Sequence, residues 1–314
     1  MKERATIGRG IGLGWRLGSL LGCGLGSSLG RVFGGVLRAV LGCMLVLAFG
    51  AAPASAQSVF NAAPPGGPPP APGPIARMPD GKPDLSGNWA IAVSIGDISA
   101  QIVRVDGEPV AADARVIPYT PVYAQLRAEA DSRMYEEPEL HCYMSGVPSH
   151  LWRQAYSGAG LIIQQSDDYI VLHHEFQGSR RIVPLSGREH IAASVRLFMG
   201  DGVGRWEGDT LVIETTNTTG ITWLDTGGNR HSDQLVVTER FTPINNDSYS
   251  YEATFVDPEA YTAPWTIAAP MTRGSDPNAE ILEFACIEGH TDHLHYTEDV
   301  GGSSDAAPSP ALSR

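Results

Sequence analysis

Basic residues are scarce in this sequence. Its 314 residues include 22 lysines and arginines against 35 aspartates and glutamates, a formal net charge of −13 at pH 7. Residues 1–56, which we expect to be removed, carry a net charge of +5, and subtracting it from −13 leaves −18 on the rest. So acidic a surface repels phosphate groups, and we expect no nucleic acid and no anionic membrane among the partners.

Cysteine is also scarce, with four residues in the chain. Cys23 and Cys43 belong to the segment that we expect to be removed, which leaves Cys142 and Cys286. In an oxidising compartment, two cysteines far apart in the sequence indicate one disulfide. A reactive thiol is the alternative, but neither residue has a catalytic local signature.

Recognisable catalytic and cofactor motifs are missing as well. The sequence contains no G-x-S-x-G, no glycine loop of the kind that cradles phosphate, and no internal repeat. These absences disfavour α/β-type serine hydrolases, nucleotide-dependent enzymes and repeat proteins. We therefore expect a function that needs no cofactor.

The N-terminal segment has the features of a secretory signal. A 12-residue apolar run, Ala39 to Gly50, follows Arg31 and Arg38 and precedes the small residues of Ala54 to Ala56. The run is too short for a membrane span and its flanks fit an A-x-A cleavage site. We expect the mature protein to begin near Gln57, to be periplasmic or secreted, and not to insert into the membrane.

The rest of the chain divides by composition. Residues 57–79 contain the stretch AAPPGGPPPAPGP, which cannot bury a core and predicts an extended linker. Residues 80–296 are expected to form a single domain, because β barrels and sandwiches of this length fold as one unit. The polar residues 297–314 predict a disordered tail.

Within the domain, strand patterns dominate. Thr120 to Met134 predicts a helix, with Thr120 as its cap and Pro121 at its first position. The predicted strands are short and separated by turn signals, as at Ser248 to Val256, where aromatic and polar residues alternate. The last strand is expected at Glu280 to Cys286. This pattern indicates an all-β antiparallel barrel with one short helix, with a β-sandwich as the alternative.

Two resemblances accompany this pattern. Gly87-Asn88-Trp89 on the first strand resembles the G-x-W signature of calycins, the lipocalin-type barrels. DGKPDLSGNW (Asp80 to Trp89) and GRWEGDTLV (Gly204 to Val212), together with VTERF and ILEFAC, resemble a large family of secreted bacterial proteins. In that family the loop after the first domain cysteine usually reads Cys-Leu-Pro-x-Gly-x-Pro, where this chain has Cys-Tyr-Met-Ser-Gly-Val-Pro. The resemblances imply a secreted, β-rich fold, and no activity.

Glu239 is the most informative polar position. If Leu235, Val237 and Phe241 face the core, two-residue periodicity places Glu239 on the same face. A buried carboxylate needs a partner, and Arg205 is the one that we expect. The pair is interpreted either as a purely structural ion pair or as part of a catalytic cavity.

His231 is the predicted acid or base. It follows a glycine-containing loop, and Asp225 lies six residues upstream, near enough to orient the imidazole. Adding Ser232 would give the residues of a hydrolase triad, but no oxyanion motif is present. The alternative is a loop histidine that only caps backbone groups.

Four further residues are predicted to contact a ligand. Trp206 and Trp223 could line a hydrophobic pocket, His174 is expected to point into the core, and Arg181 could hold a ligand carboxylate. The alternatives are two tryptophans in an ordinary core and an arginine on a solvated strand edge.

Histidine clusters suggest a metal only weakly. His173 and His174 point to opposite faces of a strand, and His290, His293 and His295 lie near the end of the domain. We expect no specific metal site, only adventitious copper or zinc binding.

Two classes of function fit these observations. The first is a cofactor-independent lyase, isomerase or cyclase acting on a small apolar or aromatic molecule, with His231, Asp225, Glu239 and Arg205 as its catalytic residues. The alternative is a periplasmic, lipocalin-like protein that binds a small hydrophobic ligand without catalysis. The fold alone cannot choose between them.

Overall fold

The computed structural model describes residues 70–93, 96–153, 160–274 and 280–286. Every described residue belongs to one compact unit of the chain. The predicted leader, residues 57–69 of the linker, and everything after residue 286 lie outside the described residues.

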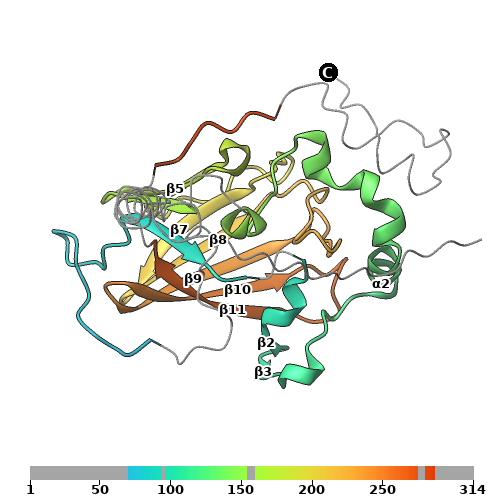
Figure 1. Ribbon diagram of the computed structural model, residues 1–314, viewed down its shortest axis with the longest axis horizontal. Helices are drawn as coiled ribbons and strands as arrows, with labels where there is room; N and C mark the ends of the chain where they lie inside the picture. Colours follow the sequence, from blue (N-terminus) through green and yellow to red (C-terminus); the bar gives the residue numbers. More distant parts are fainter. Residues whose placement is uncertain (1–69, 94–95, 154–159, 275–279, 287–314) are drawn as a thin grey trace, which may run out of the picture. The chain divides into compact units, whose positions relative to one another are not determined.

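The described residues form one sheet of eleven strands (Figure 1). Nine follow one another in the hydrogen-bonded order β6-β5-β4-β1-β11-β10-β9-β8-β7, while β2 pairs with β11 and with β3. The pairings are antiparallel. The strands are β1 (Gly87–Ile91), β2 (Ile102–Val105), β3 (Glu108–Pro109), β4 (Leu161–Gln165), β5 (Tyr169–His174), β6 (Arg180–Pro184), β7 (Asp201–Glu207), β8 (Thr210–Thr216), β9 (Val236–Asn245), β10 (Ser248–Val256) and β11 (Trp265–Arg273).

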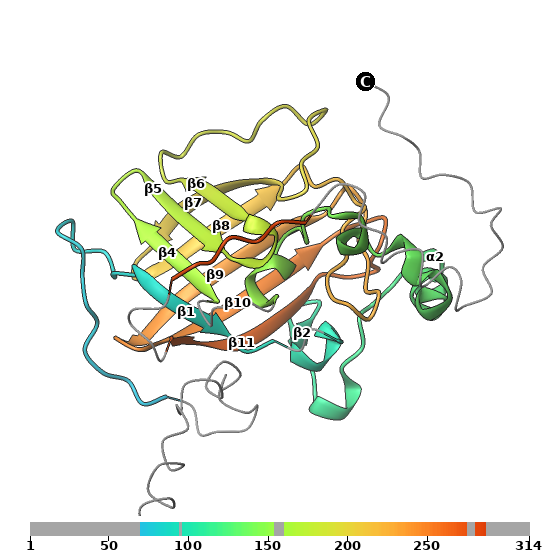
Figure 2. The same cartoon turned by 45° about the horizontal axis from the view of Figure 1, so that its top comes forward.

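The two ends of this order, β6 and β7, lie against each other and nearly close the sheet into a barrel (Figure 2). An odd number of antiparallel strands leaves the end strands running in the same direction, and no ladder joins this pair among the described strands. Gly204 permits their approach, because a Cβ there would lie 2.7 Å from Leu185 Cδ2 and 3.0 Å from Val183 Cγ1. The predicted all-β barrel is confirmed. We call the contact of β6 with β7 the seam.

The helical segments are short. They are η1 (Ile98–Gln101), η2 (Ala112–Ala114), α2 (Pro121–Ala128), η3 (Ala130–Glu136), η4 (Pro138–His141), η5 (Ser149–Trp152) and η6 (Phe176–Gly178). The helix predicted at Thr120 to Met134 begins as expected, but its α-helical part ends at Ala128 and buries no side chain; Val122 is 67% exposed. From Ala130 the chain continues as the 3-10 helix η3. None of these described helices has the length and apolar character needed to cross a membrane.

The predicted last strand does not form. Residues 280–286 are extended but join no sheet, and four of the seven are exposed. Figure 2 shows this dark red segment crossing in front of the strands. Its contacts include a hydrogen bond from the backbone N–H of Leu282 to Glu175 at 3.0 Å, the ring of Phe284 with its centroid 4.9 Å from that of Phe176, and a disulfide from Cys286 to Cys142. The predicted disulfide is therefore confirmed, while the strand prediction is wrong because the segment has no buried face.

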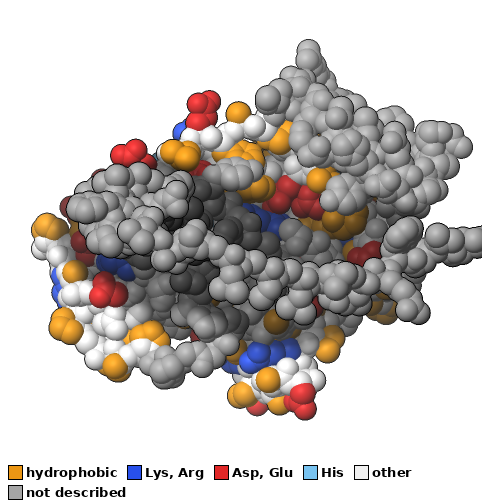
Figure 3. All heavy atoms as spheres, in the orientation of Figure 1, with side chains coloured by type: hydrophobic (Ala, Val, Ile, Leu, Met, Phe, Trp, Pro, Cys, Tyr) orange, Lys and Arg blue, Asp and Glu red, His pale blue; other side chains and the backbone are white. Residues whose placement is uncertain are grey.

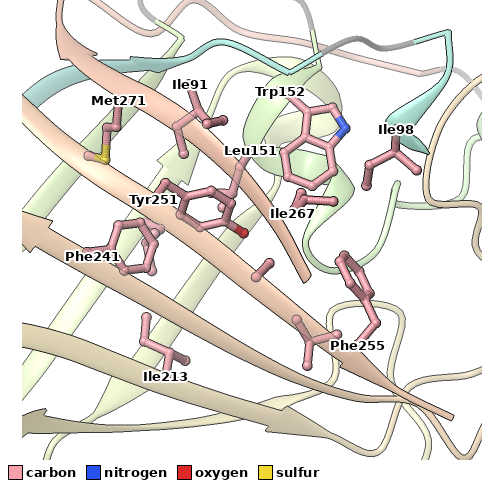
Figure 4. Close-up of a cluster of buried hydrophobic side chains, with 14 of the residues drawn as sticks. Ile91, Ile98, Leu151, Trp152, Ile213, Phe241, Tyr251, Phe255, Ile267 and Met271 are labelled. Carbon is pink, nitrogen blue, oxygen red and sulfur yellow. The ribbon is translucent and has the colours of Figure 1, made fainter. Parts of the chain in front are cut away.

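The barrel interior is packed with side chains. Tyr251, Phe241 and Ile213 reach inward from the strands, and η5 inserts Leu151 and Trp152 among them (Figure 4). The rings of Trp152 and Tyr251 meet edge to face with centroids 6.4 Å apart. These side chains fill the space that a ligand occupies in a hollow barrel. A binding site is therefore expected outside the barrel interior.

Candidate functional site

Glu239 lies in the barrel interior, as its position in β9 predicts, and is fully buried. Its partner is Arg181 of β6, whose Nη2 lies 2.6 Å from Glu239 Oε2. The Tyr251 hydroxyl donates to Glu239 Oε1 at 3.1 Å, and Arg181 Nη2 also donates to Thr215 Oγ1 at 2.8 Å. The charged pair therefore joins strands on both sides of the seam.

Gly202 gives Arg181 its path. The guanidinium starts on β6 and reaches Thr215 on β8 and Glu239 on β9, past the intervening strand β7. A Cβ on Gly202 would lie 3.3 Å from Arg181 Nη2 and 3.4 Å from Thr215 Oγ1. Because Gly202 has no side chain, the space beside its Cα is free for the Arg181 guanidinium.

Arg205 is not the partner of Glu239, and that prediction is wrong. On β7, Arg205 follows the buried Gly204 and faces outward with 52% of its side chain exposed. Its Nη2 lies 2.8 Å from Glu207, which also binds Arg240. Exposed ion pairs of this kind are screened by solvent. They contribute little to stability and little electrostatic assistance to catalysis.

His231 is buried rather than placed at a rim, and Asp225 does not orient it. His231 Nδ1 bonds to the carbonyl oxygen of Ser232 at 2.8 Å and Nε2 bonds to Thr222 Oγ1 at 2.8 Å. Burial lowers the pKa of His231, so the ring is neutral near pH 7. The Asp225 carboxylate instead accepts backbone N–H groups of Ile98 and Asn229, and burial raises its pKa. Both groups thus organise the loop before β9.

The predicted ligand contacts lie in separate places. Trp206 is half-buried on the strand that carries Arg205, with Lys82 Nζ 5.9 Å from its ring centroid. Trp223 is 2% exposed and lines a cleft described below, with the Arg230 guanidinium 4.5 Å from its ring centroid. His174 points inward as predicted, and Arg181 is buried.

A second cluster of buried polar residues lies next to Arg181, and the sequence did not predict it. His150 and Arg153 come from η5 and the residue after it, and Arg153 Nε lies 2.7 Å from Glu139. His150 Nδ1 bonds to the Gly146 carbonyl at 3.2 Å, while its Nε2 has no partner among the described residues. Burial raises the pKa of Glu137 to about 7 and lowers that of His150 well below its usual value. The only sequence signal is that SHLWR places polar residues within an apolar stretch.

His174 gives a pH-dependent prediction. Burial lowers its pKa from 6.5 to about 4, so the unfolded chain binds a proton in this window that the folded chain does not. The contribution of His174 to stability is therefore complete above pH 6.5 and is lost as the pH falls toward 4. Relative to His174→Gln, the wild type should lose about 3 kcal/mol of unfolding free energy between pH 6.5 and pH 4.

Denaturant melts of both proteins across that range check the prediction. Comparing the two proteins removes the opposite contribution of Glu137, whose raised pKa favours the folded state at low pH and is common to both. Parallel pH profiles for the two proteins would contradict the assignment to His174.

A cleft of about 750 Å³ lies among the loops that carry Tyr143, Phe198 and Ile221. Three rings stack along it: the centroid of Tyr143 lies 5.1 Å from Phe198 and 6.0 Å from His141. Leu197 and Ile221 also line it and remain 42% and 48% exposed. Exposed apolar side chains beside stacked rings are the composition of a ligand site.

The charged groups of this cleft are already paired. Arg230 lies 2.9 Å from Glu136, and Arg196 lies 3.1 Å from Asp233. Burial opposes ionisation of Glu136, but hydrogen bonds from Arg133 and Arg230 outweigh it and lower its pKa. Glu136 is therefore a carboxylate near pH 7 and a poor proton donor. The cleft favours an uncharged ligand.

Figure 3 shows the surface in the orientation of Figure 1, where acidic and hydrophobic side chains lie beside a basic one near the centre of the face. Among the described residues no group of three or more His, Cys, Asp or Glu side chains is arranged to hold a metal ion. The histidines at 290, 293 and 295 lie outside those residues.

No protein-family model, no curated protein and no solved structure matches this chain. The resemblance to secreted bacterial proteins through GRWEGDTLV and DGKPDLSGNW therefore stays a prediction. The function has to be argued from the geometry of the sites alone.

Proposed function

We propose that the protein binds a small, uncharged apolar or aromatic molecule in the cleft lined by Tyr143, Phe198, Leu197, Ile221 and Trp223. The observation that carries this proposal is the 750 Å³ cleft in which, among the described residues, the apolar side chains of Leu197 and Ile221 remain 42% and 48% exposed. Its volume lies within the range of about 300 to 1,000 Å³ that small-molecule sites occupy.

Binding has more support than acid–base catalysis. The predicted catalytic imidazole, His231, has both nitrogens bonded and is 1% exposed, and Glu136 in the cleft is held as a carboxylate. A proton-transfer enzyme needs a group that can reach its substrate. The proposal therefore follows the second of the two predicted functions, a protein that binds a small hydrophobic ligand without catalysis. The ligand is placed in the cleft and not in the interior of the barrel.

An exported location is part of the proposal. The disulfide between Cys142 and Cys286 supports an oxidising compartment, since such bonds are rare in reducing cytosol. Cys142 directly precedes Tyr143, which lines the cleft. The shape of the cleft therefore depends on a bond that forms in an oxidising compartment.

A neutral hydrophobic dye, N-phenyl-1-naphthylamine, tests the site. The wild type should enhance its fluorescence saturably, and Ile221→Asp should weaken binding by about tenfold or more, because one apolar contact is worth about 1.5 kcal/mol or more and a tenfold change is 1.4 kcal/mol. Fluorescence titration measures both.

Val116→Asp is the matched control. Val116 is 70% exposed and does not line the cleft, so the same change of chemistry there should leave dye binding unaltered. Equal loss in both variants, or none in Ile221→Asp, would rule out this cleft as the site. Both positions are exposed, so neither substitution should change stability by more than about 0.5 kcal/mol.

A further inference from the structure

The seam is tight at one end and open at the other. Gly204 packs against Val183 and Leu185, but the earlier residues of both strands line a separate pocket of about 430 Å³. We call this the seam pocket, and its lining includes Arg180, Arg181, Ile182, Met144, Phe198 and Met199. Because Arg181 belongs to its lining, the pocket lies beside the buried ion pair.

Arg181 has donor capacity that the protein does not use. Its Nη2 serves Glu239 and Thr215, whereas its Nη1 is buried and has no hydrogen-bond partner in the part of the chain that the structure describes. The side chain is 3% exposed. A buried N–H group without an acceptor is costly, so the site favours any acceptor that can reach it.

The other residues that line the seam pocket determine the chemistry of the rest of the ligand. Met144, Ile182, Phe198 and Met199 are apolar and surround the pocket beside Arg181. The one carboxylate in the lining, Asp201, accepts from Arg188 at 2.9 Å and from the backbone N–H of Ile191 at 3.1 Å. It is therefore engaged elsewhere and does not compete for Arg181.

We propose that the seam pocket binds a small monocarboxylate with a short apolar chain, whose carboxylate accepts hydrogen bonds from Arg181. A guanidinium is planar and presents several donors, so it can hold one carboxylate at Nη2 and a second at Nη1. The apolar chain lies against the methionines and Phe198. This site adjoins the cleft of the proposed function and shares Leu197 and Phe198 with it, but the cleft favours an uncharged molecule.

Calorimetric titration with hexanoate and with hexanamide tests the proposal. The two probes share a chain and differ in charge, and the wild type should bind hexanoate at least about tenfold more tightly, as expected for a charge-assisted hydrogen bond. Glu239→Gln should tighten hexanoate binding further, because it removes the carboxylate that shares Arg181.

The variant that removes the anchor is Arg181→Met combined with Glu239→Gln. Removing both charges avoids leaving one buried and unpaired, so this variant keeps its fold, which circular dichroism checks. It should lose the preference for hexanoate. Arg205→Met, on the exposed face of β7 and outside the pocket lining, should change hexanoate affinity by less than about threefold, because an exposed charge contributes little.

The proposal is overturned by equal affinity for both probes in the wild type, by a preference that survives in the double variant, or by one that disappears in Arg205→Met. Absence of hexanoate binding would also overturn it and would leave Arg181 Nη1 to a water molecule. Ile221 lines the cleft and not the seam pocket, so Ile221→Asp should leave hexanoate affinity unchanged. Failure of this site and failure of the proposed function are therefore distinguishable.

Discussion

Replacing Glu239 by alanine is expected to lower the free energy of unfolding by about 3 to 5 kcal/mol, the cost of leaving one member of a buried ion pair without its partner. Glu239 is 0% exposed and Arg181 3%, so the substitution leaves Arg181 as a buried charge without its counter-ion. The Tyr251 hydroxyl loses its acceptor in the same change. Domains of this kind are stable by about 5 to 15 kcal/mol, so the loss is a large share.

The position of the pair in the fold increases the effect. No ladder of backbone hydrogen bonds joins β6 to β7 among the described strands, so the seam depends on side chains. Arg181 crosses it to reach β8 and β9. Losing Glu239 therefore weakens the closure of the barrel as well as the local contact, and hydrogen exchange should show β6 opening before β10.

Equilibrium denaturation in urea measures the change. Arg205→Ala is the matched control, because Arg205 forms an exposed pair with Glu207 and should cost about 1 kcal/mol at most. Neutralising both members, with Arg181→Met and Glu239→Gln together, should recover most of the stability that Glu239→Ala loses. A loss for Glu239→Ala no larger than that for Arg205→Ala would refute the role of the pair.

The inward orientation of Glu239 could be predicted, but its partner could not. Two-residue alternation along β9 depends only on neighbouring residues, and Leu235, Val237 and Phe241 are buried as expected. The choice of Arg205 required knowing which strands close the barrel. Arg181 is 58 residues away in sequence and reaches Glu239 across Gly202, a route that depends on a missing side chain.

The same limit applies to His231 and the cleft. Loop position suggested an accessible imidazole, but the loop folds inward and satisfies both ring nitrogens with Thr222 and Ser232. The cleft combines residues from three loops, and only Trp223 among them was predicted. Strand periodicity predicts a barrel well, whereas the meeting of distant loops is set by tertiary packing that local patterns do not encode.

The disulfide has consequences for both stability and binding. It joins Cys142 to Cys286 across a sequence separation of 144 residues and holds a segment that otherwise belongs to no sheet. Cys142 itself has a left-handed backbone with φ of 61°. The next two residues, Tyr143 and Met144, line the cleft and the seam pocket respectively. The bond thus fixes the loop from which both sites are built.

Replacing Cys142 and Cys286 together by serine should lower the free energy of unfolding by about 5 kcal/mol, because a loop of this length loses its closure constraint in the unfolded chain. For a domain of this size that corresponds to a fall in Tm of roughly 10 to 20 °C. Dye binding to the cleft should weaken as well, since Tyr143 is no longer held against Phe198. Calorimetry and dye titration measure the two effects, and a reducing agent should reproduce both in the wild type while leaving the serine variant unchanged. A Tm that falls while dye affinity stays constant would confine the bond to a stabilising role and separate it from the cleft.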